Sequence, residues 1–177
     1  MTIINKDTVV ISGFPGIGKT YAQQHSSGIV LDSDSSRFSW ARNADGTVKI
    51  DANGTKLRHP EFPKNYMEHI KGNIGKADII YVSSHDNVRE ALNKAKIPHV
   101  LVYPSYEMKE EMVQRYIDRG SSKGFVELIK NNWDNFISGM KKDPCPNKIE
   151  LKPGEFLADV IEKAKEMLTS KKIKVIK

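Results

Sequence analysis

The strongest structural signal in this sequence is the run Gly13-Phe14-Pro15-Gly16-Ile17-Gly18-Lys19-Thr20. The run matches G-x-x-x-x-G-K-[ST], the phosphate-binding P-loop, at every fixed position. The residues before it, Thr8–Ser12, are apolar and β-branched like those of a buried parallel strand, and Tyr21–Gln24 suit the start of a helix. Strand, glycine-rich loop and helix therefore follow in the order that the motif needs.

The loop also predicts a ligand. Its glycines let backbone N–H groups face phosphate oxygens, and the helix that follows adds the positive end of its dipole. We expect Lys19 to act in catalysis by reaching the β- and γ-phosphates of ATP, and the Thr20 hydroxyl to ligate Mg²⁺. ATP and Mg²⁺ are thus the expected cofactors. The expected nucleotide-binding residues are Gly13, Pro15, Gly16, Ile17, Gly18, Lys19 and Thr20.

Length and composition set the class of protein. The 177 residues fit one domain, and a net charge of +6 suits a phosphate-bearing ligand. A single cysteine, Cys145, rules out an internal disulfide and a cysteine-only metal site. The sequence lacks a basic, apolar leader and any apolar run that could span a bilayer. We therefore expect a cytoplasmic protein without a membrane partner.

Strand and helix signals alternate along the chain, which predicts an α/β fold. The crossovers are long enough for parallel pairing, so we expect a three-layer fold in which helices flank a parallel sheet of about five strands. Predicted strands are Thr8–Ser12, Gly28–Asp32, Asp78–Ser83, His99–Tyr103 and a short one at Ile149–Leu151. Predicted helices are Lys19–His25, Lys64–Ile74, Asp86–Ala95, Tyr106–Arg119, Phe125–Met140 and Glu155–Leu168.

The stretch Ser33–Pro63 departs from this alternation. It is rich in turn signals and long for a simple connection, and long ordered loops in compact domains are usually functional. Thr47–Ile50 and Thr55–Leu57 flank Asn53-Gly54 and predict a small hairpin.

The arrangement of motifs narrows the P-loop class. The chain lacks the base-reading Asn-Lys-x-Asp of GTPases. Its third predicted strand and the residues that follow it, as far as Asp86, lack the acidic pair of remodelling ATPases. The chain resembles the nucleoside and nucleotide kinase group, most of all small bacteriophage and bacterial (deoxy)nucleotide kinases. The resemblance implies a single P-loop kinase domain over residues 1–177, with an acceptor-binding insertion at about 33–75 and a lid at about 115–125.

A second motif follows the second predicted strand. The spacing of Asp34 and Arg37 resembles that of polynucleotide 5′-kinases, in which an aspartate orients the attacking hydroxyl and an arginine binds the acceptor phosphate. The resemblance implies that Asp34 and Arg37 act in catalysis and acceptor binding, and it leaves Asp34 as a candidate Mg²⁺ ligand. That family's appended phosphatase domain is missing here. The residues also allow a simpler reading, an Asx-turn that caps a helix.

The predicted lid carries two arginines. Arg115 and Arg119 are four residues apart and share a helix face, and Gly120-Ser121-Ser122 then ends the helix. The resemblance implies that both arginines act in catalysis, closing on the phosphates and excluding water. A solvated helix whose arginines pair with neighbouring carboxylates is the alternative. Arg58 in the insertion and His85 after the third strand are further candidates for acceptor binding.

These expectations converge on an ATP-dependent phosphotransferase. A (deoxy)nucleoside monophosphate is the first acceptor to expect, and Asp34 would then bind sugar or Mg²⁺ because that acceptor needs no base. The alternative is a hydroxyl acceptor, namely a polynucleotide 5′-OH, a nucleoside or another small alcohol, for which Asp34 is the base. Only this alternative involves nucleic acid. A regulatory module that binds ATP with little turnover also remains open, as does a homodimer.

Overall fold

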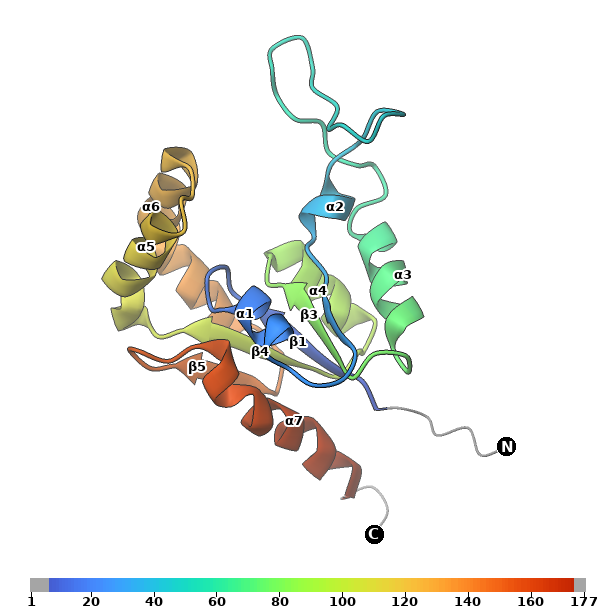
Figure 1. The fold of residues 1–177 in the computed structure, drawn as a ribbon, viewed down its shortest axis with the longest axis vertical. Coiled ribbons are helices and arrows are strands. Elements are labelled where there is room, and N and C mark those ends of the chain that lie inside the picture. The colour runs from blue at the N-terminus through green and yellow to red at the C-terminus, as the bar shows by residue number, and fades with distance from the viewer. Residues whose placement is uncertain (1–6, 174–177) are drawn as a thin grey trace.

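The computed structural model describes residues 7–173, which form a parallel sheet between two layers of helices (Figure 1). The sheet has five strands in the order β2-β3-β1-β4-β5, and every neighbouring pair is parallel. The α/β fold class with about five parallel strands is therefore confirmed. The strands are β1 Val9–Gly13, β2 Val30–Asp32, β3 Ile79–Ser83, β4 His99–Pro104 and β5 Lys148–Leu151.

Helices cover both faces of this sheet. The α-helices are α1 Lys19–Gln24, α2 Ser36–Ser39, α3 Lys64–Asn73, α4 Asp86–Lys94, α5 Lys109–Asp118, α6 Lys123–Lys142 and α7 Leu157–Ile173. Successive residues of a strand point to opposite faces, and this alternation separates two clusters of buried side chains. Val10 of β1 packs with α3 and α4, whereas Ile11 belongs to the larger cluster that includes α1, α6 and α7.

Most predicted elements appear within a few residues of their expected bounds. The helix expected at Tyr106–Arg119 is divided into a 3₁₀ turn, Tyr106–Met108, and α5. The last helix begins at Leu157 and continues to Ile173, beyond the predicted end. The short helix α2 was not predicted, because four residues are too few to show a helical period.

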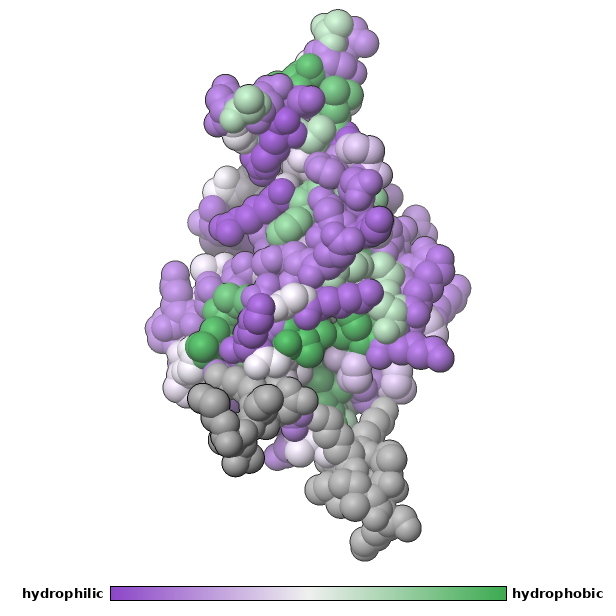
Figure 2. Space-filling model, turned by 90° about the vertical axis from the view of Figure 1, so that its right-hand side faces the viewer, coloured by the Kyte–Doolittle hydropathy of each residue, from purple (hydrophilic) through white to green (hydrophobic). Residues whose placement is uncertain are grey.

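The segment at 40–58, here called the arm, projects from the body of the molecule (Figure 1). Isolated antiparallel bridges join Trp40 to Arg58, Arg42 to Val48 and Ile50 to Lys56. The predicted hairpin is thus present as single bridges rather than as continuous strands. Figure 2 shows hydrophobic and hydrophilic residues side by side on this projection. Among the helices of residues 7–173, none is both long enough and apolar enough to cross a membrane.

Candidate active site

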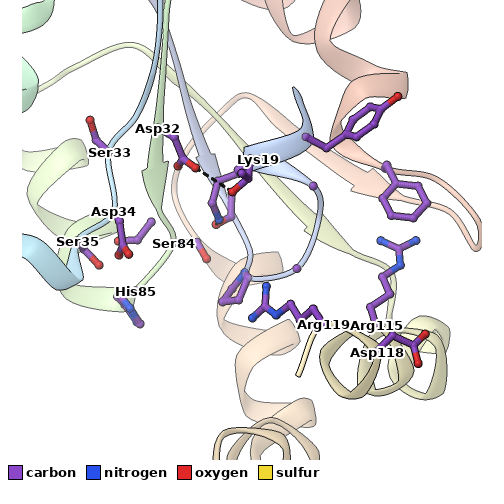
Figure 3. Close-up of a pocket in the computed structure, with 18 residues that line it drawn as sticks. Lys19, Asp32, Ser33, Asp34, Ser35, Ser84, His85, Arg115, Asp118 and Arg119 are labelled. Carbon is purple, nitrogen blue, oxygen red and sulfur yellow. Dashed lines mark hydrogen bonds between the residues drawn. The ribbon is translucent and has the colours of Figure 1, made fainter. Parts of the chain in front are cut away.

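A cavity of about 730 Å³ opens at the carboxyl ends of β1, β2 and β3. Strands β1 and β4 are neighbours in the sheet, but the chain runs from β1 to β2 on one side and from β4 to β5 on the other. Open α/β sheets bind ligands at such points. The P-loop forms the floor of the cavity. One wall comes from the ends of β2 and β3, and the other comes from α5 and the loop before α7 (Figure 3).

The P-loop connects β1 to α1 and depends on its glycines. Gly16 and Gly18 have φ angles of 79° and 99°, in the left-handed region that favours glycine. A Cβ atom on Gly16 would also lie 2.4 Å from Cε1 of Tyr116. Ile17 is buried beneath the loop rather than facing the cavity, and its carbonyl accepts a 2.8 Å hydrogen bond from the Leu157 amide. The other predicted nucleotide-binding residues all line the cavity.

The Lys19 side chain folds back onto the backbone of the P-loop. Its Nζ atom donates to the carbonyl oxygens of Gly13, at 2.7 Å, and Phe14, at 3.2 Å. Burial lowers the pKa of Lys19 to about 8, and the negative charges of Asp32 and Asp34 oppose that shift. A phosphate that replaced the carbonyl contacts would meet a desolvated ammonium group, whose electrostatic interactions are stronger than in water.

The predicted metal ligands Thr20 and Asp34 are not in hydrogen-bond contact with each other. Instead, Thr20 Oγ1 donates to Oδ2 of Asp32 at 3.1 Å, as the dashed line in Figure 3 marks. Sequence reasoning missed Asp32 as a site residue, although its place as the last residue of β2 was a usable signal. Within residues 7–173, no three His, Cys, Asp or Glu side chains gather closely enough to hold a metal ion by themselves.

Asp34 lies on the cavity wall beyond Asp32. Its Oδ1 accepts a 2.8 Å hydrogen bond from the backbone amide of Ser36, the first residue of α2. The turn role that the sequence left open is therefore present, and the same side chain also lines the cavity. Ser33, Ser35, Ser84 and His85 line this wall with it.

Of the other residues predicted to bind the acceptor, one lines the cavity and two do not. His85 lines the cavity, and partial removal from water together with the charge of Arg58 lowers its pKa. Arg37 is exposed on α2 and does not line the cavity. Arg58 lies on the arm, with its guanidinium 4.4 Å from the centre of the Trp40 ring, and is also outside the lining.

Both predicted lid arginines line the cavity, but their surroundings differ. Arg115 donates from Nη2 to the Glu155 carbonyl at 2.9 Å, and its guanidinium lies 3.8 Å from the Phe156 ring centre. Its Nη1 atom is buried without a hydrogen-bond partner in the described part of the chain. Arg119 is exposed, and its Nε donates to Ser121 Oγ at 2.9 Å. The helix break predicted after Arg119 separates α5 from α6.

Helix α5 is attached directly to the P-loop. The Tyr116 hydroxyl donates to the Pro15 carbonyl at 2.7 Å. One half of the site has three cations, Lys19, Arg115 and Arg119, and one carboxylate, Asp118, and is called here the cationic half. The other half, at the ends of β2 and β3, is acidic and rich in hydroxyl groups (Figure 3). No family model matches the chain, and no curated protein shows significant similarity to it.

Proposed function

We propose that this protein is an ATP-dependent phosphotransferase whose acceptor is a hydroxyl group. One observation carries the choice of acceptor. The wall formed by the ends of β2 and β3 presents Asp32, Asp34, serine hydroxyls and His85, and within residues 7–173 no lysine or arginine lines it. A monophosphate placed there would bring further negative charge beside two carboxylates, and like charges at short range repel each other. A hydroxyl finds hydrogen-bond partners on the same wall.

The cationic half suits the triphosphate of ATP. Backbone N–H groups of the P-loop and the ammonium group of Lys19 would hold the β- and γ-phosphates. Arg119, which is exposed at the cavity, would neutralise charge on the group being transferred. Most of the catalytic effect would come from positioning and from fixed charges, as is general for phosphoryl transfer.

The pair Thr20 and Asp32 fits a magnesium site. Mg²⁺ prefers oxygen ligands and is usually held by one or two carboxylates together with substrate phosphates, so a larger cluster is not required. Thr20 Oγ1 and Asp32 Oδ2 already lie 3.1 Å apart at the carboxyl edge of the sheet. Bound there, the ion would supply positive charge to the phosphate oxygens.

Asp34 is the residue we assign as general base. Its Oδ1 is held by the Ser36 amide, which leaves Oδ2 to accept the proton of the acceptor hydroxyl. The hydroxyl oxygen forms the new bond to the γ-phosphorus while the bond to the β,γ-bridging oxygen breaks. ADP then leaves, and the proton remains on Asp34.

Paired acceptors test this proposal. The protein is incubated with γ-³²P-ATP and with nucleosides, 5′-OH oligonucleotides and small polyols, each beside its phosphorylated counterpart. We expect label on hydroxyl members of the pairs and none with Lys19→Ala. Label on nucleoside monophosphates alone would instead support the acceptor first expected from the sequence, with Arg37 or Arg58 moving inward. ATP binding without acceptor-dependent ADP release would support a regulatory module.

A further inference from the structure

The hydrogen-bond ladder between β2 and β3 ends in an unusual way. The strands pair in register from Val30 with Ile79 to Asp32 with Tyr81, and the Ser33 amide then donates to the Tyr81 carbonyl at 2.9 Å. In a parallel ladder the carbonyl of the same residue accepts from the amide two positions further along the partner strand. The next rung would therefore run from the Ser83 amide to the Ser33 carbonyl.

The hydroxyl of Tyr66 occupies the place of that rung. It donates to the Ser33 carbonyl at 2.5 Å and accepts from the Ser83 amide at 3.2 Å. One side chain from α3 thus satisfies both backbone groups while keeping them apart. Two hydrogen bonds through an oxygen atom span a greater distance than one direct N–H···O bond, so the strand ends diverge at this point.

The surroundings of Tyr66 hold its ring in place. The side chain is fully buried, with its ring centre 5.2 Å from that of Phe38 and 6.1 Å from that of Phe62. Burial raises the pKa of its hydroxyl, so the group keeps its proton and remains a donor. The neighbouring His69 adds a second hold on the same loop, because its Nε2 lies 2.9 Å from Ser33 Oγ.

The Tyr66 hydroxyl lies at the base of the wall formed by the ends of β2 and β3, here called the acceptor half of the site. Ser33 stands between the two carboxylates Asp32 and Asp34, and Ser83 directly precedes Ser84 and His85. We propose that Tyr66 is a positioning residue whose hydroxyl, inserted in the last rung, holds the ends of β2 and β3 apart and thereby sets the width of the acceptor half. The identity of the occupant rests on the function proposed above, whereas the spacing does not.

The test compares Tyr66→Phe with a matched control, Tyr103→Phe. Tyr103 is also buried, but it lies on β4 and does not line the cavity. In crystals of Tyr66→Phe we expect Ser83 N and Ser33 O to approach to a direct hydrogen bond of about 2.9 Å. For the hydroxyl acceptor labelled by the wild type, we expect KM to rise by about 10- to 100-fold, since displacements near 1 Å have effects on the order of 10²-fold.

The affinity for MgATP should change less than twofold in Tyr66→Phe, and neither quantity should change in Tyr103→Phe. All measurements are made well below the melting temperature of each variant. An unchanged Ser83–Ser33 spacing overturns the proposal, and so does an equal loss of acceptor and MgATP affinity, which would mark Tyr66 as a general core residue. If the wild type labels no hydroxyl compound, the proposed function fails, and the spacing in the variant crystal still decides the role of Tyr66.

Discussion

Charge and burial oppose each other at Lys19. The ammonium group is tied to loop carbonyls in a desolvated position, and its pKa falls to about 8. Phosphate binding favours the charged form. If the loop binds ATP as we propose, a protein that has lost this proton would take one up on binding, so proton uptake and nucleotide affinity would be linked.

We therefore predict that affinity for a non-hydrolysable ATP analogue with Mg²⁺ falls above pH 8. The loss should approach tenfold per pH unit, because the fraction of charged Lys19 falls by that factor once pH exceeds the pKa. Titration calorimetry at pH 7, 8 and 9 measures it. Lys19→Ala should bind weakly at each pH and should lose on the order of 10²–10³ in transfer rate. A wild-type affinity that is constant from pH 7 to 9 would show that Lys19 does not carry the phosphate contact.

The order of strand, glycine-rich loop and helix could be predicted from the sequence, because the motif is local and its turns follow from its glycines. It did not predict the contact between Thr20 and Asp32. That hydrogen bond joins residues 12 positions apart and depends on how β2 docks beside β3. The role of Tyr66 is hidden for the same reason, since a hydroxyl that replaces a ladder rung has no local sequence signal.

Two arginines on the same predicted face of α5 have different surroundings. Spacing placed Arg115 and Arg119 together, and both line the cavity. The Arg115 side chain is only 13% exposed and joins α5 to Glu155 and Phe156, whereas Arg119 is bonded within its own turn. Burial and partners outside the helix cannot be read from the spacing of residues within it.

We predict that substitution of Arg115 affects stability, whereas substitution of Arg119 affects catalysis. Arg115→Ala should lower the free energy of unfolding by about 1–3 kcal/mol, because the partly buried Glu155 carbonyl loses its charged donor. At this chain length each kcal/mol corresponds to roughly 2–4 °C in melting temperature. Arg119→Ala should leave the melting temperature nearly unchanged and should lower kcat. Thermal unfolding and steady-state kinetics separate the two effects, and the reverse pattern would contradict the assignment of Arg119 to transfer.

The other elements were predictable to differing degrees. The arm contains the turn predicted at Asn53-Gly54, because the residues that favour a turn act locally. The orientation of the arm, which keeps Arg58 outside the cavity, is a tertiary property.

The whole molecule depends on a sheet whose strand order no local pattern reveals. Alternation along the chain predicted parallel strands and flanking helices, but not that β1 lies between β3 and β4. That order brings buried side chains of distant segments together. One of them is His99 on β4, which is 4% exposed and whose backbone carbonyl accepts a 3.3 Å hydrogen bond from the Asn147 side chain.

We predict that His99 makes stability dependent on pH. Burial lowers its pKa below 6.5, and the contact of Nδ1 with the Ile97 carbonyl and the charge of Asp143 only partly offset that shift. The unfolded chain then binds more protons than the folded one, so stability is complete above about pH 6.5 and is lost as pH falls below it. Each unit of lowering corresponds to about 1.4 kcal/mol.

Urea unfolding between pH 7.5 and 5 measures this dependence. His99→Gln should flatten part of it, and His69 and His85, whose pKa values are also lowered, should account for a remainder. An identical slope in His99→Gln and the wild type would contradict the prediction.

In the function proposed above, Asp34 takes a proton from an acceptor hydroxyl during transfer from ATP. The most direct measurement is the single-turnover rate of labelling, with saturating acceptor and Mg²⁺, in the wild type and in Asp34→Asn. Asn keeps the shape of the side chain and its contact with the Ser36 amide but cannot accept the proton. We predict that the rate falls by about 10²–10⁴ and that excess acceptor or Mg²⁺ does not restore it. An unchanged rate, or one restored by excess acceptor or Mg²⁺, would contradict the account and leave Asp34 as a turn or binding residue.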